Sequence, residues 1–186
     1  MRLRRLEGEF SGRLRIVHRA FVLVPDDRTD RTFRDYHRAH RQAAAAQGDD
    51  APRFRIPDAG ERYPRCSFPA LEAAAWARDA HPEAFAAFDA AVFEAFFGRT
   101  EDIGDLAVLC RIAAPCGLDA AELSSAVRDG RYRARVIADH QEAARLGIRG
   151  VPAVAFPGQS PIVGAVPYSD LRQAAGAALR EADGIS

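Results

Sequence analysis

The sequence predicts an α/β fold in which an all-helical region is inserted between two strand-forming parts of the chain. Residues 14–24 are rich in β-branched and aromatic residues, which favour strands. Residues 69–146 instead repeat apolar side chains at helical spacing, and residues 151–166 return to a strand-like pattern. With 186 residues, 48 % of them hydrophobic and 28 % charged, the chain is long and apolar enough to bury a core without disulfide or metal staples.

The first part of the chain is expected to hold a helix followed by a strand. Leu3, Leu6 and Phe10 lie at helical spacing between charged residues, which predicts an amphipathic helix. Residues 14–24 alternate at first and are then apolar on both faces. That pattern is typical of a strand covered on both sides of its sheet.

A second helix and a long loop are expected next. Asp30 or Thr32 is the expected N-terminal cap of a helix that runs through an alanine-rich stretch, and Gly48 is expected to end it. Residues 49–65 contain three prolines and a glycine, which predict a connecting loop.

The helical block is expected to contain five helices that are separated by prolines and glycines. Their expected ranges are 69–80, 82–97, 105–114, 119–130 and 131–146. The second helix carries a stripe of phenylalanines, which is typical of a buried face. The fourth begins with the capping-box pattern Asp119-Ala-Ala-Glu122.

The last part of the chain is expected to be a hairpin and a helix. Residues 151–156 and 162–166 favour strands, and the proline- and glycine-containing turn 157–161 separates them. Residues 171–182 place leucines and alanines three and four apart, which predicts an amphipathic terminal helix.

Charge and hydropathy exclude several classes of protein. The 26 basic residues, all of them arginine, balance 26 acidic ones, so no general field favours nucleic acid or an anionic membrane. The most apolar run, residues 86–97, is interrupted by Asp89 and Glu94 and is too short to span a membrane. No apolar signal core follows the start of the chain, so we expect a cytoplasmic protein that binds neither nucleic acid nor membrane.

The cysteines and histidines do not predict a metal site. Cys66, Cys110 and Cys116 form neither a Cys-x-x-Cys pair nor a zinc-finger spacing, and we expect reduced thiols that fill space in the helical region. His37 and His40 lie three apart on a predicted helix, but no third ligand follows at a fitting spacing. The arginines near the start, at positions 2, 4 and 5, are interpreted as a solvated helix face rather than as a phosphate or glutathione site.

Three segments carry a resemblance to a known family. Residues 144–156, Ala-Arg-Leu-Gly-Ile-Arg-Gly-Val-Pro-Ala-Val-Ala-Phe, resemble the Leu-Gly-Val-x-Gly-Val-Pro-x-x-Val-Phe segment of the DsbA-like thiol oxidoreductases. Residues 19–23 resemble that family's second strand. Residues 93–97 with 102–105, followed by 117–119, resemble the helical insertion of its cytosolic FrnE-like branch.

The resemblance implies a thioredoxin-like fold, a substrate-binding loop and a reaction type. The thioredoxin-like domain would comprise residues 1–25 and 131–186, and the helical insertion residues 26–130. Pro152 would follow a cis peptide bond, and the backbone of Val151 would pair with an extended substrate strand. The implied activity is thiol–disulfide exchange with protein or peptide thiols, without a cofactor or a metal ion.

One motif of the family is absent from these 186 residues. In the family, a strand and a Cys-x-x-Cys motif come just before a segment like Leu3–Glu7, and catalysis depends on that pair of thiols. No catalytic residue is therefore predicted here, and we expect the chain by itself to be inactive. Our hypothesis is that Met1 is an internal methionine or that the chain is a fragment; otherwise a strand from a second copy in a homodimer, or a redox-dead relic, would be expected.

Two other classes of function stay open. One is a glutathione-dependent enzyme of the 2-hydroxychromene-2-carboxylate isomerase and kappa-class transferase type, in which a serine often replaces the first cysteine. The other is a non-catalytic binding module that uses a sheet edge or the helical insertion to hold a partner. A Cys-x-x-Cys upstream would favour the oxidoreductase, and a lone serine there would favour the glutathione enzyme.

Overall fold

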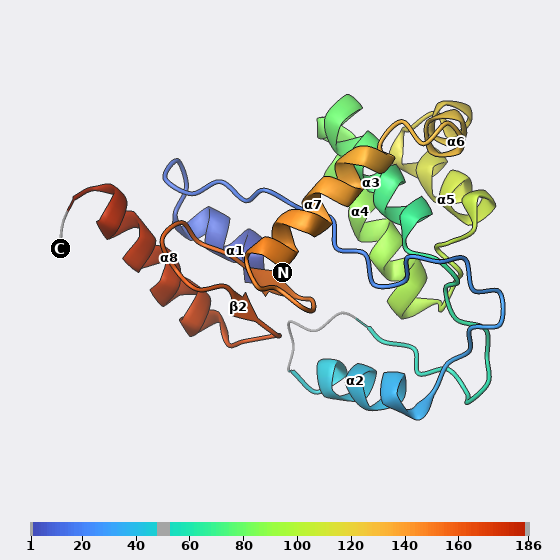
Figure 1. Cartoon of the computed structure of the whole chain (residues 1–186), viewed down its shortest axis with the longest axis horizontal. Helices are drawn as coiled ribbons and strands as arrows, with labels where there is room; N and C mark the ends of the chain where they lie inside the picture. Colours follow the sequence, from blue (N-terminus) through green and yellow to red (C-terminus); the bar gives the residue numbers. More distant parts are fainter. Residues whose placement is uncertain (1, 48–52, 185–186) are drawn as a thin grey trace. The chain divides into compact units, whose positions relative to one another are not determined.

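The computed structural model describes residues 2–47 and 53–184 of the chain. Contacts within the chain divide it into two compact units: unit 1 is Met1–Arg19 with Gln141–Ser186, and unit 2 is Ala20–His140. In chain order (Figure 1), the elements are α1 (Arg2–Glu9), α2 (Asp35–Ala45), α3 (Phe68–Ala80), α4 (Pro82–Phe93), a π-helix (Glu94–Gly98), α5 (Leu106–Ala113), a 3₁₀-helix (Ala114–Cys116), α6 (Ala120–Arg128), α7 (Arg133–Arg145), β1 (Ala153–Val154), β2 (Ile162–Val163) and α8 (Tyr168–Ala182). The domain limits expected from the sequence, after residues 25 and 130, stay a prediction.

Unit 1 is built on a short hairpin and two helices. Strands β1 and β2 pair antiparallel, with Ala153 opposite Val163 and Val154 opposite Ile162. Helix α1 packs against α8. Their shared core contains Leu6, Phe156, Leu171 and Ala175. Both strands are shorter than the sequence predicts, but the hairpin and the terminal helix lie where it places them.

Residues 14–24 do not form the strand that their composition predicts. A strand needs a neighbour that bonds its backbone N–H and carbonyl groups. Within the described residues, the one sheet consists of β1 and β2. The prediction of a strand was therefore wrong for this structure, because the segment has strand propensity but no strand beside it.

At the end of this segment, every second backbone N–H donates to a side chain where a strand would donate to its neighbour. The bonds run from Ala20 N–H to Asp139 Oδ2 (3.1 Å), from Val22 N–H to His140 Nδ1 (3.3 Å) and from Val24 N–H to Ser67 Oγ (2.9 Å). Two of the acceptors lie on α7, and Ser67 is the residue before α3. Backbone N–H groups that would bond to a neighbouring strand in a sheet thus bond to polar side chains of unit 2.

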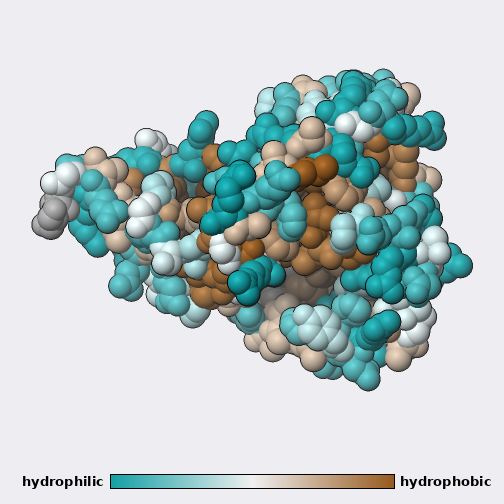
Figure 2. Space-filling model, viewed as in Figure 1, coloured by the Kyte–Doolittle hydropathy of each residue, from teal (hydrophilic) through white to brown (hydrophobic). Residues whose placement is uncertain are grey.

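Unit 2 contains the larger core. Helices α3 to α6 bury one cluster around Trp76, Phe88, Leu109 and Leu123. In Figure 2, hydrophilic residues cover much of the visible face of the molecule, and apolar residues show between them. Across residues 2–47 and 53–184, no helix is both long and apolar enough to span a membrane.

Two helices of unit 2 begin after a capping aspartate, and the sequence predicts one of these caps, Asp119. The carboxylates of Asp105 and Asp119 accept the N–H groups of Ala107 (2.8 Å) and Ala121 (2.7 Å), which caps α5 and α6. The capping box at Asp119 is only half formed, however. The Glu122 carboxylate accepts the indole N–H of Trp76 (3.2 Å) and so links α6 to α3.

Helix α2 begins later than predicted. It starts at Asp35, whereas Thr32 forms an isolated antiparallel bridge with Arg62, so the expected caps Asp30 and Thr32 do not open it. The Nδ1 atom of His37 accepts the N–H of Arg34 (3.0 Å) instead. The expected end at Gly48 lies outside the described residues.

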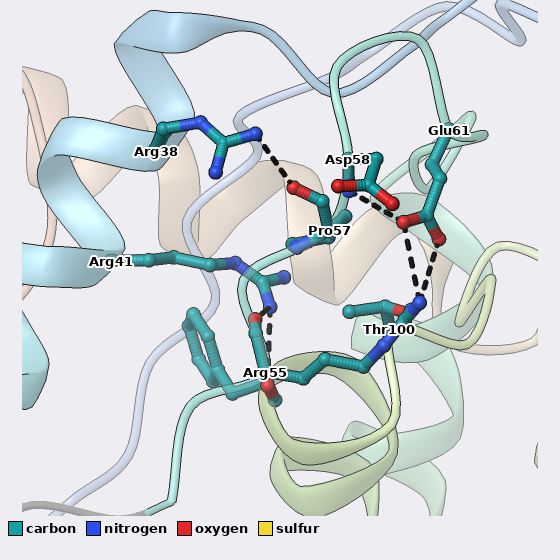
Figure 3. A network of polar contacts seen from close by, with 8 residues as sticks. Arg38, Arg41, Arg55, Pro57, Asp58, Glu61 and Thr100 are labelled. Atoms are coloured by element: carbon teal, nitrogen blue, oxygen red, sulfur yellow. Dashed lines mark hydrogen bonds and ion pairs between the residues drawn. The ribbon is translucent and has the colours of Figure 1, made fainter.

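The buried side chain of Arg41 connects α2 to the loop at Arg55 and to the π-helix within unit 2. It is 3 % exposed and donates to the carbonyls of Arg55 (2.8 Å), Phe97 (3.1 Å) and Phe96 (3.0 Å). Two of these carbonyls lie in the π-helix, where the last turn of a helix leaves acceptors free. In Figure 3, Arg38 and Arg41 extend from α2 toward the loop that carries Arg55 and Pro57.

Candidate functional site

The candidate site is the loop that joins α7 to β1. Helix α7 ends at Arg145, and Gly147 follows with a φ of 75°, a left-handed conformation that favours glycine. Gly147 N–H donates to Ala144 O (3.0 Å) and Ile148 N–H to Ala143 O (2.9 Å), a pair of bonds typical of a helix C-terminus. The glycine thus turns the chain out of the helix and into the loop.

The residues singled out from the sequence, Val151 and Pro152, lie on the surface of this loop. The peptide bond between them is cis. Val151 is 47 % exposed, although it is a large apolar residue, and Pro152 is exposed as well. Two apolar residues are therefore accessible immediately before β1.

The hairpin determines which backbone groups of this loop stay open. Gly164 N–H donates to Pro152 O (2.8 Å), so Pro152 faces β2. Because neighbouring residues of an extended strand direct their backbone groups to opposite edges, Val151 and Ala153 face away from β2. Among the described residues, the backbone of Val151 has no hydrogen-bond partner. This edge can accept an extended strand through backbone hydrogen bonds.

The three cysteines lie in unit 2, and each is a free thiol. Cys110 Sγ lies 3.4 Å from Ala120 O, and Cys66 Sγ lies 3.8 Å from Pro25 O. Burial raises the pKa of the Cys116 thiol, which is the opposite of what an attacking thiol requires. Cys110 and Cys116 pack beside the core of unit 2, as expected for thiols that fill space, whereas Cys66 is not part of that cluster.

Two histidines, His37 and His140, accept hydrogen bonds from backbone N–H groups. The Nδ1 atoms of His37 and His140 each accept an N–H, from Arg34 and Val22, so each ring carries its proton on Nε2 when it is neutral. Burial, with the nearby charges of Arg31, Arg34 and Arg41, lowers the pKa of His37. No group of three or more potential metal-ligating side chains occurs in the described part of the chain.

Sequence reasoning missed several residues that organise the structure around this site and in unit 2. Gly164 orients Pro152, Asp139 and His140 hold residues 20–24, and Arg41 holds α2. Only Gly164 carries a local signal, a glycine directly after a short strand. The charged residues resemble ordinary surface residues until their distant partners are known.

Fold and loop together define a class of protein: an α/β protein with a thioredoxin-like fold and a helical insertion. The model of the DSBA-like thioredoxin domain family matches residues 53–176, about two thirds of the chain. The chain therefore belongs to the DSBA-like thioredoxin domain family.

Two solved structures are similar over nearly the whole chain. A candidate DsbA oxidoreductase from Streptomyces coelicolor is 26 % identical with a TM-score of 0.73, over 100 % of this chain and 83 % of that one. A candidate protein disulfide isomerase from Nitrosomonas europaea is 24 % identical with a TM-score of 0.71, over 97 % of this chain and 89 % of that one. The search of curated proteins gives no match.

Proposed function

We propose that the protein takes part in thiol–disulfide exchange with protein or peptide thiols and that this chain supplies the edge that holds the substrate strand. Membership of the DSBA-like thioredoxin domain family supports the reaction class. The similar structures of a candidate DsbA oxidoreductase and a candidate disulfide isomerase support it further. The cytoplasmic location expected from the sequence stays part of this proposal.

The observation that carries the proposal is the open backbone edge at Val151 and Ala153. Pro152 is already bonded to Gly164 on the β2 side, so an extended peptide can pair only on the opposite side. Backbone pairing gives affinity with little sequence preference, which suits an enzyme that acts on many unfolded chains.

The attacking thiol is not assigned to any of the three cysteines. In exchange, a thiolate attacks one sulfur of a disulfide, forms a mixed disulfide and releases the other sulfur as a thiolate; a second thiol then resolves the mixed disulfide. Cys66, Cys110 and Cys116 form no Cys-x-x-Cys pair and no disulfide. We therefore propose that these 186 residues bind a substrate strand without carrying out the redox step.

Binding is tested by nuclear magnetic resonance of the labelled chain with a short cysteine-free peptide rich in threonine and valine. We expect amide shifts at Val151 and Ala153. Val151→Pro removes the N–H donor and should weaken binding about tenfold, which corresponds to the loss of one or two hydrogen bonds. Arg149→Pro, at an exposed position of the same loop, is the matched control and should leave binding within about twofold. Equal effects of the two substitutions would contradict the proposal.

Redox activity is tested by insulin reduction with dithiothreitol. The chain, and a variant in which all three cysteines are serine, should both match the rate in buffer alone. A cysteine-dependent acceleration would contradict the proposal that these 186 residues do not carry out the redox step. The intact mass of the protein from its own cells, read with the in-frame codons upstream of Met1, would show whether the natural product carries a Cys-x-x-Cys.

The non-catalytic binding module is the second candidate, and the lack of a Cys-x-x-Cys pair among the three cysteines of these 186 residues favours it. Peptide binding at Val151 together with a natural product that lacks a Cys-x-x-Cys would select this function over the oxidoreductase.

A further inference from the structure

A groove runs along α8 in unit 1, on the face beside Phe10. Its volume is about 550 Å³, and it is lined by Phe10, Ser169, Arg172, Gln173, Gly176 and Arg180. Ion pairs lie near both ends: Arg172 pairs with Glu9, and Arg13 pairs with Asp183. The groove is thus a defined feature of the packing between α8 and the segment that follows α1.

The lining of the groove is positively charged. It contains two arginines and no carboxylate. Arg172 is neutralised by Glu9, whose pKa is lowered by hydrogen bonds from Tyr168 and Arg172. Arg180, in contrast, has no hydrogen bond or ion pair among the described residues. One guanidinium in the groove therefore has all its donors available to a ligand.

Gly176 keeps the floor of the groove open. Glycine inside a helix is destabilising relative to alanine, and alanines stand on both sides of it at positions 175 and 177. A Cβ atom at position 176 would lie 3.5 Å from Nη1 of Arg180, an ordinary contact, so packing does not require glycine here. The same distance shows that the Arg180 guanidinium lies over Gly176, one turn back along the helix.

We propose that this groove binds an acidic peptide segment, with a carboxylate paired to Arg180 and a neighbouring apolar side chain against Phe10. The fork of a guanidinium matches a carboxylate in two parallel hydrogen bonds. From Ser169 to Arg180 the helix rises about 16 Å, which equals about five residues of extended peptide. The amide of Gln173 is a polar group within that span, whereas the Ser169 hydroxyl already donates to the Asp170 carboxylate (3.0 Å).

The test is fluorescence anisotropy of the 186-residue chain with a labelled, C-terminally amidated peptide, Glu-Leu-Glu-Leu-Glu. We expect saturable binding below about 1 mM, which is lost at high salt. Arg180→Gln should weaken binding about tenfold. Arg128→Gln, which removes the same charge from the exposed end of α6, should change it less than about twofold.

A second variant separates binding from stability. Gly176→Ala fills the floor of the groove while it strengthens α8. It should therefore weaken peptide binding and raise the melting temperature, a combination that unfolding cannot produce.

Three outcomes would overturn the proposal: no binding below about 1 mM, unchanged binding in Arg180→Gln, or equal binding of the neutral peptide Gln-Leu-Gln-Leu-Gln. The same acidic peptide with a free C-terminus identifies the source of the carboxylate. Tighter binding than the amide would assign the terminal carboxylate to Arg180, and equal binding would assign a glutamate side chain.

Discussion

Glu72 is a buried carboxyl that the fold only partly satisfies. Its side chain is fully buried on α3, where Oε1 accepts the Nε–H of Arg133 at 2.6 Å and Oε2 has no partner among the described residues. Burial raises the pKa of Glu72, and the charge and hydrogen bond of Arg133 oppose that shift. The fold therefore disfavours the charged form of Glu72 relative to the unfolded chain.

The sign of this shift predicts how stability depends on pH. Because the folded-state pKa of Glu72 lies above its ordinary value of 4.5, its contribution to stability is full below pH 4.5 and is lost as the pH rises through the folded-state pKa. Glu72→Gln does not titrate, so the free energy of unfolding of the wild type should fall relative to this variant as the pH rises. Urea unfolding at a series of pH values measures the difference.

Glu101 provides a control of opposite sign. Burial opposes the shift, but hydrogen bonds from Arg99 and Arg111 lower the pKa of Glu101. The wild type should therefore gain stability relative to Glu101→Gln as the pH rises toward the ordinary value, and the gain should be complete above it. If both variants show the same trend with pH, the assignment of Glu72 is wrong.

Some residues with a local role could be predicted from the sequence, whereas residues with a distant partner could not. Asp119 caps α6 and Gly147 ends α7, because each acts on atoms of its own segment. The cap expected at Asp30 or Thr32 is wrong, however, because α2 begins at Asp35. Arg41 and Asp139 act on residues far along the chain. Nothing in their neighbourhood in the sequence distinguishes them from the other charged residues.

At the scale of elements, residues 20–24 depend on acceptors that α7 supplies. Asp139→Ala should lower the free energy of unfolding by about 1–3 kcal/mol, because it leaves the buried N–H of Ala20 without an acceptor. Glu142→Ala, three residues on and exposed, should cost less than about 0.5 kcal/mol. Urea unfolding measures both. Similar losses in the two variants would show that Asp139 does not hold this segment.

Helix α2 has a comparable dependence on one side chain. Arg41→Met keeps most of the aliphatic length but removes the donors to three carbonyls, two of them in the π-helix. The cost should be about 3 kcal/mol or more, because unpaired buried acceptors are expensive. Arg128→Met, at an exposed position, should be close to neutral. Circular dichroism during thermal unfolding would compare them, and an equal melting temperature would contradict the role of Arg41.

The one element that sequence reasoning mistook, residues 14–24, shows the limit of propensity. Ala20 and Val22 are buried, but Val17 is 48 % and Leu23 is 62 % exposed, so the expectation of a segment covered on both faces was wrong. Whether such a segment becomes a strand depends on a neighbour. That neighbour is not a property of the segment itself, and the lack of a neighbouring strand could be inferred only by comparing the order of elements with that of the family.

At the scale of the whole molecule, the two units differ in the size of their cores. Unit 2 buries Trp76, Phe88, Leu109 and Leu123 in one cluster, whereas unit 1 rests on a two-stranded hairpin and two helices. A hairpin of this length is marginal without further packing. Hydrogen exchange should therefore be slowest at the core amides of α5 and α6 and faster in β1 and β2. Equal protection in both units would show that they unfold together.

The fold class could be predicted from the order of elements and from residues 144–156. The same order occurs in the DSBA-like thioredoxin domain family, to which the chain belongs. The candidate site could be predicted only as far as Val151 and Pro152. The groove on α8 could not, because its members come from α8 and from Phe10, far apart in the sequence.

Trp76 is the single tryptophan of the chain, and it is 1 % exposed in the core of unit 2. Its indole N–H is bonded to Glu122, and its ring contacts that of His81. Tryptophan fluorescence is therefore a spectroscopic reporter of unit 2. A denaturation curve followed by tryptophan emission would describe unit 2, and any offset from the far-ultraviolet dichroism curve would give the separate unfolding of the unit that carries Val151.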